Sequence, residues 1–264
     1  MENVVSKDGT SIAYEREGSG PAIFIVAGAL SDRRAAKAVS QILSKDFVVY
    51  TYDRRGRGDS GDTPPYAVER EVEDLAALID AAGGPALVFG HSSGAVLALE
   101  AASRLKQIER LAIYEPPFIT DATRAPVPAD YVQTIDELIR SGRRGDAIEY
   151  FMTVAVGTPA GAVAGMRQSP YWPGMEKIAH TLIYDGMIMG DTMSGGPLGT
   201  TRWSSLAIPV LVMDGGASPT WARNSVEIVA RLLPNGGRRT LEGQTHGADP
   251  AILAPVLARF FTAP

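Results

Sequence analysis

The chain has 264 residues, of which 45% are hydrophobic and 21% charged, ordinary values for one large domain with a substantial core. Its formal net charge of −5 at pH 7 argues against a nucleic-acid partner, because phosphate binding requires a basic face. Basic clusters such as "DRRGRGD" are interleaved with acids and glycine, so we interpret them as solvated loops.

The absence of cysteine excludes disulfides and thiolate metal sites, and it fits a reducing compartment. Nothing in the sequence indicates a metal or an organic cofactor. The first twenty residues lack a basic stretch followed by an apolar one, so we expect no signal peptide. Apolar runs are far shorter than the ~20 residues of a membrane helix. We therefore predict a cytoplasmic protein without a membrane partner.

Strand and helix patterns alternate along most of the chain. "ENVVSKDGTSIAYEREG" predicts two strands joined by a tight turn at Asp8-Gly9. Further strands are predicted at "PAIFIVAG", "FVVYTYD", "ALVFG", "IERLAIYEPP", "IPVLVMDGG" and "GRRTLEG". Helices are predicted at "DRRAAKAVSQILSKD", "VEREVEDLAALIDAAGG", "GAVLALEAASRL" and "PAILAPVLARFF". This alternation indicates an α/β fold with a mostly parallel sheet flanked by helices.

Strand patterns disappear between residues 118 and 202. Helical patterns replace them, at "DYVQTIDELIRSG", "GDAIEYFMTVAVG" and "MEKIAHTLIYDGMIMG", with prolines and glycines between them. We predict that residues 1–117 and 203–264 form the core, and that residues 118–202 form a helical cap inserted at the carboxyl edge of the sheet.

The stretch Gly90-His91-Ser92-Ser93-Gly94 is a G-x-S-x-G pattern between a predicted strand and a predicted helix. A sharp turn there requires both glycines, because side chains would collide with neighbouring backbone, and it exposes the central residue. Ser92 is therefore the predicted nucleophile. The Ser93 N–H, near the positive end of the helix, is a predicted donor to an oxyanion.

This arrangement resembles the α/β-hydrolase superfamily over nearly the whole chain. "YDRRGRGDSGD" is similar to the family's D-x-R-G-x-G-x-S loop, and "IVAGAL" stands where the family has its H-G-x oxyanion loop. Ala27 replaces the usual histidine and Gly28 is kept, so the resemblance implies that the Ala29 N–H is the second oxyanion donor. Because that donor is backbone, the loss of the histidine need not remove activity, but it affects how rigidly the loop is held.

The resemblance also points to the catalytic base. His246 lies in "LEGQTHGADP", between the last strand and the final helix, where α/β hydrolases carry their histidine. His180 is the competitor, and we interpret it as a pocket-lining or structural residue. His91 lies inside the sharp turn and is expected to point away from the site.

The usual acid position of the family falls near Ser218, which cannot hold an imidazolium by charge. Two carboxylates could replace it, each at the end of a strand at the carboxyl edge. We favour Glu115, where a minority of α/β hydrolases place their acid and where Pro116-Pro117 restrict the chain. Asp214 is the alternative, although a bond to loop backbone is its leading interpretation.

The region of the cap is rich in large apolar side chains, and no cluster of cations faces the expected site. The predicted pocket residues are Phe118, Trp172, Met175, His180, Tyr184 and Trp221. A small or medium-sized apolar ester or lactone fits such a pocket better than a polyanion.

We therefore expect a cofactor-independent serine esterase that cleaves a carboxylic ester or lactone through an acyl-enzyme on Ser92, with a Ser-Glu-His triad. Hydroxynitrile lyase, perhydrolase and acyltransferase are alternatives, because they use the same triad. A ligand receptor on the hydrolase fold is an alternative from another class. The sequence leaves the oligomeric state open, a homodimer included.

Overall fold

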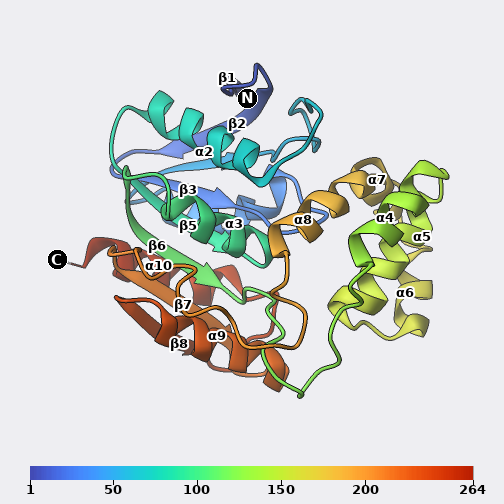
Figure 1. Cartoon of the computed structure of the whole chain (residues 1–264). Coiled ribbons are helices and arrows are strands. Elements are labelled where there is room, and N and C mark those ends of the chain that lie inside the picture. The colour runs from blue at the N-terminus through green and yellow to red at the C-terminus, as the bar shows by residue number, and fades with distance from the viewer. Residues whose placement is uncertain (264) are drawn as a thin grey trace.

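A computed structural model describes residues 1–263, which build an eight-stranded sheet in the order β1-β2-β4-β3-β5-β6-β7-β8. β2 runs antiparallel to β1 and β4, and the other neighbours pair in parallel. The predicted mostly parallel sheet is thus confirmed (Figure 1). The strands are β1 (Glu2–Val5), β2 (Ser11–Gly18), β3 (Ala22–Val26), β4 (Val48–Tyr52), β5 (Ala86–His91), β6 (Ile108–Tyr114), β7 (Val210–Gly215) and β8 (Gly236–Leu241).

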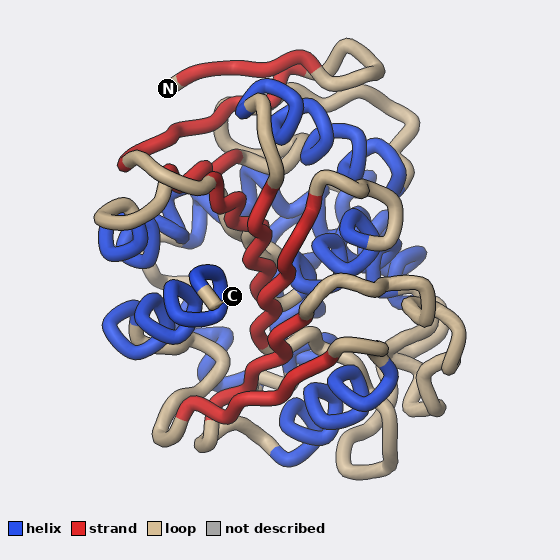
Figure 2. The backbone as a smooth tube through the Cα atoms, turned by 90° about the vertical axis from the view of Figure 1, so that its left-hand side faces the viewer, coloured by secondary structure: helices blue, strands red, loops and turns tan. Residues whose placement is uncertain are grey.

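Helices cover both faces of this sheet, which Figure 2 shows nearly edge-on. One face packs against α2 (Val68–Ala82), α3 (Ser93–Ala102) and α9 (Thr220–Leu232). The other packs against α1 (Lys37–Leu43), which follows the short η1 (Arg33–Ala36), and α10 (Pro250–Thr262). Successive strand residues face opposite sides, so β3 sends Phe24 to the first core and Ile25 to the second.

A third group of helices lies between β6 and β7 in the chain and beside the carboxyl ends of the strands (Figure 1). We call them the inserted helices. They pack around their own apolar core, and α8 also contacts α3. Their members are α4 (Tyr131–Arg140), α5 (Arg144–Tyr150), the π-helical η2 (Phe151–Val156), α6 (Ala160–Met166), α7 (Trp172–Ile178), η3 (Ala179–Thr181) and α8 (Leu182–Met189).

Two of the helices, α6 and α9, go beyond those that the sequence patterns predict. α6 consists largely of alanine and glycine, and it has no amphipathic stripe to mark it. α9 begins directly after the loop of Ser218, where the sequence patterns predict no helix. Its first turn carries Trp221, so this helix contributes directly to the site described below.

The register of the central strands brings three chain segments to one edge. His91 at the end of β5 pairs with Tyr114 of β6, which pairs with Met213 of β7. The residues that follow each of them therefore lie at the same edge of the sheet, where open α/β folds collect their sites.

The basic loop after β4 corrects one prediction, because its arginines are buried. Arg54, Arg55 and Arg57 are each at most 1% exposed. The interpretation of "DRRGRGD" as a solvated loop is therefore wrong. The reason is that each guanidinium meets carboxylates from elements distant in the chain, namely Glu71 and Asp74 on α2, Asp8, and Asp185 on α8.

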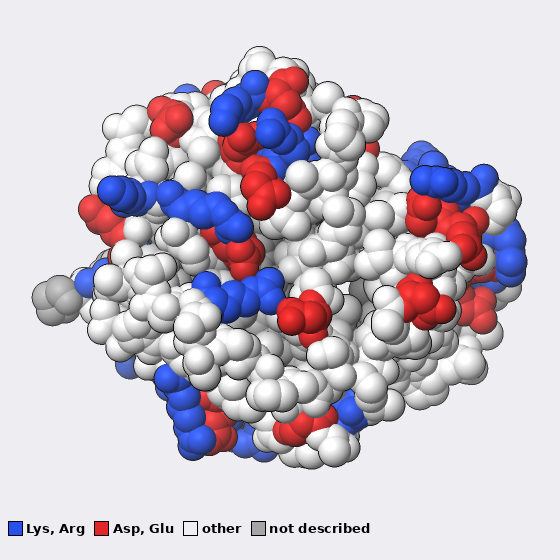
Figure 3. Space-filling view, in the orientation of Figure 1, with Lys and Arg blue, Asp and Glu red and all other residues white. Residues whose placement is uncertain are grey.

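The surface carries no broad field of one sign on the face that Figure 3 shows, where acidic and basic side chains are interspersed. Within residues 1–263, no helix has both the length and the apolar character that crossing a bilayer requires.

The packing around α3 predicts that Gly94→Ala destabilises the fold. A Cβ at Gly94 would lie 2.3 Å from the carbonyl oxygen of Val26, so backbone must shift. We expect a loss of about 3 kcal/mol and a thermal midpoint lower by about 10 °C, measured by circular dichroism. Gly161→Ala in α6 is the matched control, since its Cβ meets nothing within 4 Å; equal midpoints for the two variants would contradict the prediction.

The half-buried His91 predicts a pH dependence of stability. Burial, with a smaller effect of the neighbouring His246, lowers the pKa of His91 to about 4, against about 6.5 in the unfolded chain. The unfolded chain therefore binds a proton at His91 that the folded protein does not bind. The folded state keeps its full free energy of unfolding above pH 6.5 and loses part of it as the pH falls toward 4. Between pH 7 and pH 5 we expect wild type to lose about 1–2 kcal/mol more than His91→Gln in urea unfolding. Equal losses in both proteins would refute this role of His91.

Candidate active site

Ser92 stands at a sharp turn between β5 and α3, with φ 58° and ψ −127°. The turn is tight enough that neither flanking glycine can be replaced freely. A Cβ at Gly90 would lie 2.6 Å from the Gly94 carbonyl oxygen, and Gly94 lies against the end of β3. Backbone contacts thus hold the serine in a conformation that L-residues rarely adopt, and its side chain lines a cavity.

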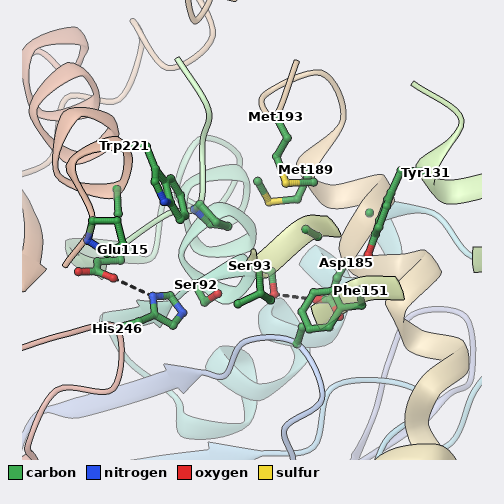
Figure 4. A pocket seen from close by; sticks show the side chains of 17 residues that line it. Ser92, Ser93, Glu115, Tyr131, Phe151, Asp185, Met189, Met193, Trp221 and His246 are labelled. Atoms are coloured by element: carbon green, nitrogen blue, oxygen red, sulfur yellow. Dashed lines mark hydrogen bonds and ion pairs between the residues drawn. The ribbon is translucent and has the colours of Figure 1, made fainter. Parts of the chain in front are cut away.

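His246 lies beside this serine, with its ring between Ser92 and the carboxylate of Glu115 (Figure 4). His246 Nδ1 is 2.8 Å from Glu115 Oε2. A carboxylate only accepts, so Nδ1 carries a proton, and in the neutral imidazole the lone pair is then on Nε2. Two hydrogen bonds to backbone hold the loop that carries His246. The Tyr114 hydroxyl donates to the Thr245 carbonyl at 2.6 Å, and His91 Nε2 donates to the His246 carbonyl at 2.8 Å.

Glu115 is 2% exposed and is held in place from two sides. The Gly215 N–H donates to its Oε1 at 2.8 Å, while His246 occupies Oε2. Burial alone would raise the pKa of Glu115, but the hydrogen bonds from His246 and Gly215 hold that pKa below its ordinary value. Ser218, at the family's usual acid position, lies near this carboxylate, and its hydroxyl also helps to lower the pKa of Glu115.

Asp214, the alternative acid, points elsewhere. Its carboxylate is fully buried and accepts from Thr240 at 3.0 Å, and it pairs with Arg223 and Arg238 at 3.3 and 3.2 Å. These partners come from β8 and α9. In the structure His246 is therefore bonded to Glu115, while the Asp214 carboxylate links β7 to β8 and α9.

Backbone strain is concentrated at this site. Among residues 1–263, the non-glycine residues with positive φ are Leu30 (51°), Ser92 (58°) and Glu115 (45°). They belong to the loop after β3, the turn after β5 and the turn after β6. Such conformations cost of order 1–3 kcal/mol each and persist where surrounding structure fixes them, as at active sites.

The predicted oxyanion donors, Ala29 and Ser93, both line the cavity beside Ser92. Gly28 packs closely on the nucleophile, since a Cβ there would lie 3.0 Å from Ser92 Cβ. Ser93 is the first residue of α3, so its N–H is one of the donors that a helix start leaves without an intrahelical partner. In the described part of the chain, no three His, Asp or Glu side chains are grouped so that they could hold a metal ion.

The cavity beside Ser92 has a volume of about 200 Å³ and is mostly apolar. Its exceptions are the Ser92–His246–Glu115 group, Ser93 and Asp185. The inserted helices supply one wall, and the core supplies the other through its loops and the first turns of α3 and α9 (Figure 4). The apolar lining comprises Ala29, Pro117, Tyr131, Phe151, Ala155, Val156, Gly186, Met189, Met193, Pro219, Trp221 and Ala222.

Of the six predicted pocket residues, the structure brings only Trp221 to this cavity. Phe118 is fully buried and stacks on Trp203, with ring centroids 5.6 Å apart. Trp172 and Met175 pack in the apolar core of the inserted helices, away from the cavity.

The other two predicted pocket residues, Tyr184 and His180, lie outside the cavity, near Asp62. Tyr184 donates to Asp62 at 2.7 Å and stacks on Tyr66, and His180 lies 3.6 Å from the same carboxylate. Neither lines the cavity, so His180 is not placed as a base or as a pocket residue. Composition marks a segment as apolar, but the helical rotation that decides which side chains face a cavity is set by packing.

Tyr131, Phe151, Asp185, Met189 and Met193 line the cavity although the sequence does not single them out as pocket residues. Asp185 carries the one signal that could have found it, a carboxylate inside the otherwise apolar helix "LIYDGMIM".

Comparisons with known proteins identify the fold and the family of this chain. A model of the Alpha/beta hydrolase family matches residues 18–256. The crystal structure of an alpha/beta hydrolase from Sphaerobacter thermophilus DSM 20745 is 56% identical, with a TM-score of 0.93 over 99% of this chain and 100% of that chain.

Two curated relatives match over shorter stretches. The uncharacterized hydrolase YraK of Bacillus subtilis (strain 168) is 36% identical over 113 residues, 41% of this chain and 42% of that protein. The N-formylmaleamate deformylase of Pseudomonas putida is 30% identical over 154 residues, 56% of this chain and 57% of that protein. The chain thus matches less than two thirds of either relative. Since the family model spans most of the sequence, the chain belongs to the alpha/beta hydrolase family.

Proposed function

We propose that this protein is a serine hydrolase that cleaves a carboxylic ester or lactone through an acyl-enzyme on Ser92. The observation that carries the proposal is the strained Ser92 beside a histidine whose Nδ1 is bonded to a buried carboxylate, at the wall of an apolar cavity. Family membership supports hydrolysis, and similar proteins carry names such as hydrolase and lipase.

In the proposed mechanism, His246 Nε2 takes the proton of Ser92 as its oxygen attacks the carbonyl carbon. Glu115 keeps the Nδ1 proton in place and stabilises the imidazolium that forms. The Ala29 and Ser93 N–H groups stabilise the oxyanion. The alkoxy group leaves with the proton from His246, and a water activated by the same histidine then releases the acid and restores Ser92.

The cavity supports a substrate of small to medium size. Its volume of about 200 Å³ is comparable to an apolar protein cavity of ~150 Å³ that accepts benzene. Met189, Met193 and Trp221 offer polarisable apolar surface, which suits an alkyl or aromatic acyl group or a compact lactone ring. No Lys or Arg side chain lines it among the described residues, so a polyanionic substrate is disfavoured.

The proposal predicts that Ser92→Ala abolishes turnover. We expect steady-state hydrolysis of a series of p-nitrophenyl esters to show multiple turnovers for wild type and a loss of about 10⁵-fold or more in the variant. Chain-length preference should peak at short or medium acyl groups because of the cavity volume. Equal rates for the two proteins, or no turnover by wild type with any ester or lactone, would refute a serine esterase mechanism.

The choice of acid predicts different effects for two variants. Glu115→Gln should lower kcat by about 10³-fold, because the amide favours the wrong tautomer of His246 and cannot stabilise its cation. Asp214→Asn is the matched control: it also alters a buried strand-end carboxylate, but we expect kcat within about threefold and a lower thermal midpoint, since the ion pairs of Asp214 with Arg223 and Arg238 are lost. A dead Asp214→Asn beside an active Glu115→Gln would reverse the assignment.

A further inference from the structure

The buried arginines of the loop after β4 fall into two groups. Arg55 is the arginine of the D-x-R-G-x-G-x-S pattern, and it pairs with Asp74 at 2.7 Å and Asp8 at 2.9 Å, away from the site. Arg54 and Arg57 stand at positions that the pattern leaves open. Both contact the loop that follows β3, which carries the proposed oxyanion donor Ala29.

Arg57 is the closer of the two to that loop. Its Nη1 donates to the Gly28 carbonyl oxygen at 2.6 Å, and its Nη2 donates to Asp185 Oδ2 at 2.7 Å. Arg54 Nη1 donates to the Ala27 carbonyl oxygen at 3.3 Å and to Asp185 Oδ1 at 2.8 Å. Two cations thus bind two successive carbonyls of the loop, at the place where the family's histidine is missing.

The contact with Gly28 acts on Ala29 through one peptide group. The Gly28 carbonyl and the Ala29 N–H belong to the same planar trans peptide, so they point in opposite directions. With the carbonyl directed into the protein toward Arg57, the N–H is directed outward, on the side where Ala29 lines the cavity. A charged donor on the carbonyl also polarises the amide, which strengthens its N–H as a donor.

Asp185 fixes the guanidinium and connects it to the second oxyanion donor. Its Oδ1 accepts from the Ser93 hydroxyl at 2.7 Å (Figure 4). Burial would raise the pKa of Asp185, but the charges of Arg57 and Arg54 hold it below the ordinary value, so the carboxylate is ionised. Glu71, bonded to Arg54 at 2.7 Å, balances the remaining charge. The cluster is therefore two cations against two anions, shielded from water.

We infer that Arg57, anchored by Asp185, is a positioning residue that orients and polarises the Ala29 N–H in place of the missing oxyanion-loop histidine. This inference rests on the proposed function. Its consequence is that a cation without access to the substrate strengthens the oxyanion hole. Because Asp185 belongs to an inserted helix, the same contact ties the wall of the cavity to the catalytic loop.

The test compares Arg57→Lys and Arg57→Met with Arg55→Lys as the matched control. All three alter a buried arginine of one loop, but only position 57 contacts Gly28. An alkyl fluorophosphonate phosphonylates Ser92 and releases fluoride, and the rate is measured by intact mass. This rate reports a single nucleophilic attack by Ser92, in which negative charge develops on an oxygen in the oxyanion hole. Ester hydrolysis gives kcat and KM, and circular dichroism confirms that each variant is folded.

We expect the rate of phosphonylation and kcat to fall about 10-fold in Arg57→Lys and about 50-fold in Arg57→Met. The KM of both variants should stay within about threefold of the wild-type value. Arg55→Lys should lower the thermal midpoint but react within about twofold of wild type. If Arg57→Met does not fold, Asp185→Asn serves instead, because it keeps the shape and removes the charge that anchors Arg57. We expect its phosphonylation to fall about fivefold.

The outcomes separate the two proposals. A wild type that fluorophosphonate does not label at Ser92 overturns the proposed function, and this inference with it. Labelling of wild type, with folded Arg57 variants that react as fast as wild type, overturns the inference alone. Equal slowing by Arg55→Lys also overturns it, since the effect would then follow from general loss of stability.

Discussion

The site depends on one steric constraint, the close approach of three backbone segments around Ser92. The end of β3, the turn after β5 and the first turn of α3 meet where glycine stands at positions 28, 90 and 94. A Cβ at Gly90 or Gly94 would collide with backbone, and a Cβ at Gly28 would make a tight contact with Ser92 Cβ at 3.0 Å. The contacts therefore hold Ser92 at a positive φ and place the loop of Ala29 next to it. Parallel strand register then brings Glu115 to the same edge.

The chain departs from the pattern of its family at two positions, and near each of them a residue from another part of the chain makes a contact at the site. Ser218 replaces the usual acid, and Glu115 enters from the neighbouring strand with its carboxylate on His246. Ala27 replaces the oxyanion-loop histidine, and Arg57 binds the carbonyl of the adjacent glycine. In both cases the contact is made by a side chain from another element, and we propose that this side chain takes over the missing role.

The inserted helices supply a buried carboxylate as well as apolar walls of the cavity. Their π-helical segment and α8 provide apolar walls, and α8 carries Asp185 into contact with Ser93 and the loop arginines. A buried carboxylate on an otherwise apolar helix is costly unless it is paired, and here two guanidinium groups pair with it. The position of these helices is thus coupled to the loop beneath the site by charge as well as by packing.

The fold class, the strained turn at Ser92 and the short list of acids follow from the sequence, because they depend on local patterns: continuous apolar runs that alternate with helical patterns, glycines two residues either side of a serine, and carboxylates at strand ends. Pocket residues do not follow, since packing sets the rotation of each helix; Phe118 and Trp172 became core while Met193 reached the cavity. The burial of Arg54 and Arg57 was likewise decided by tertiary structure. Their partner Asp185 lies about 130 residues away, and no local pattern records a contact at that separation.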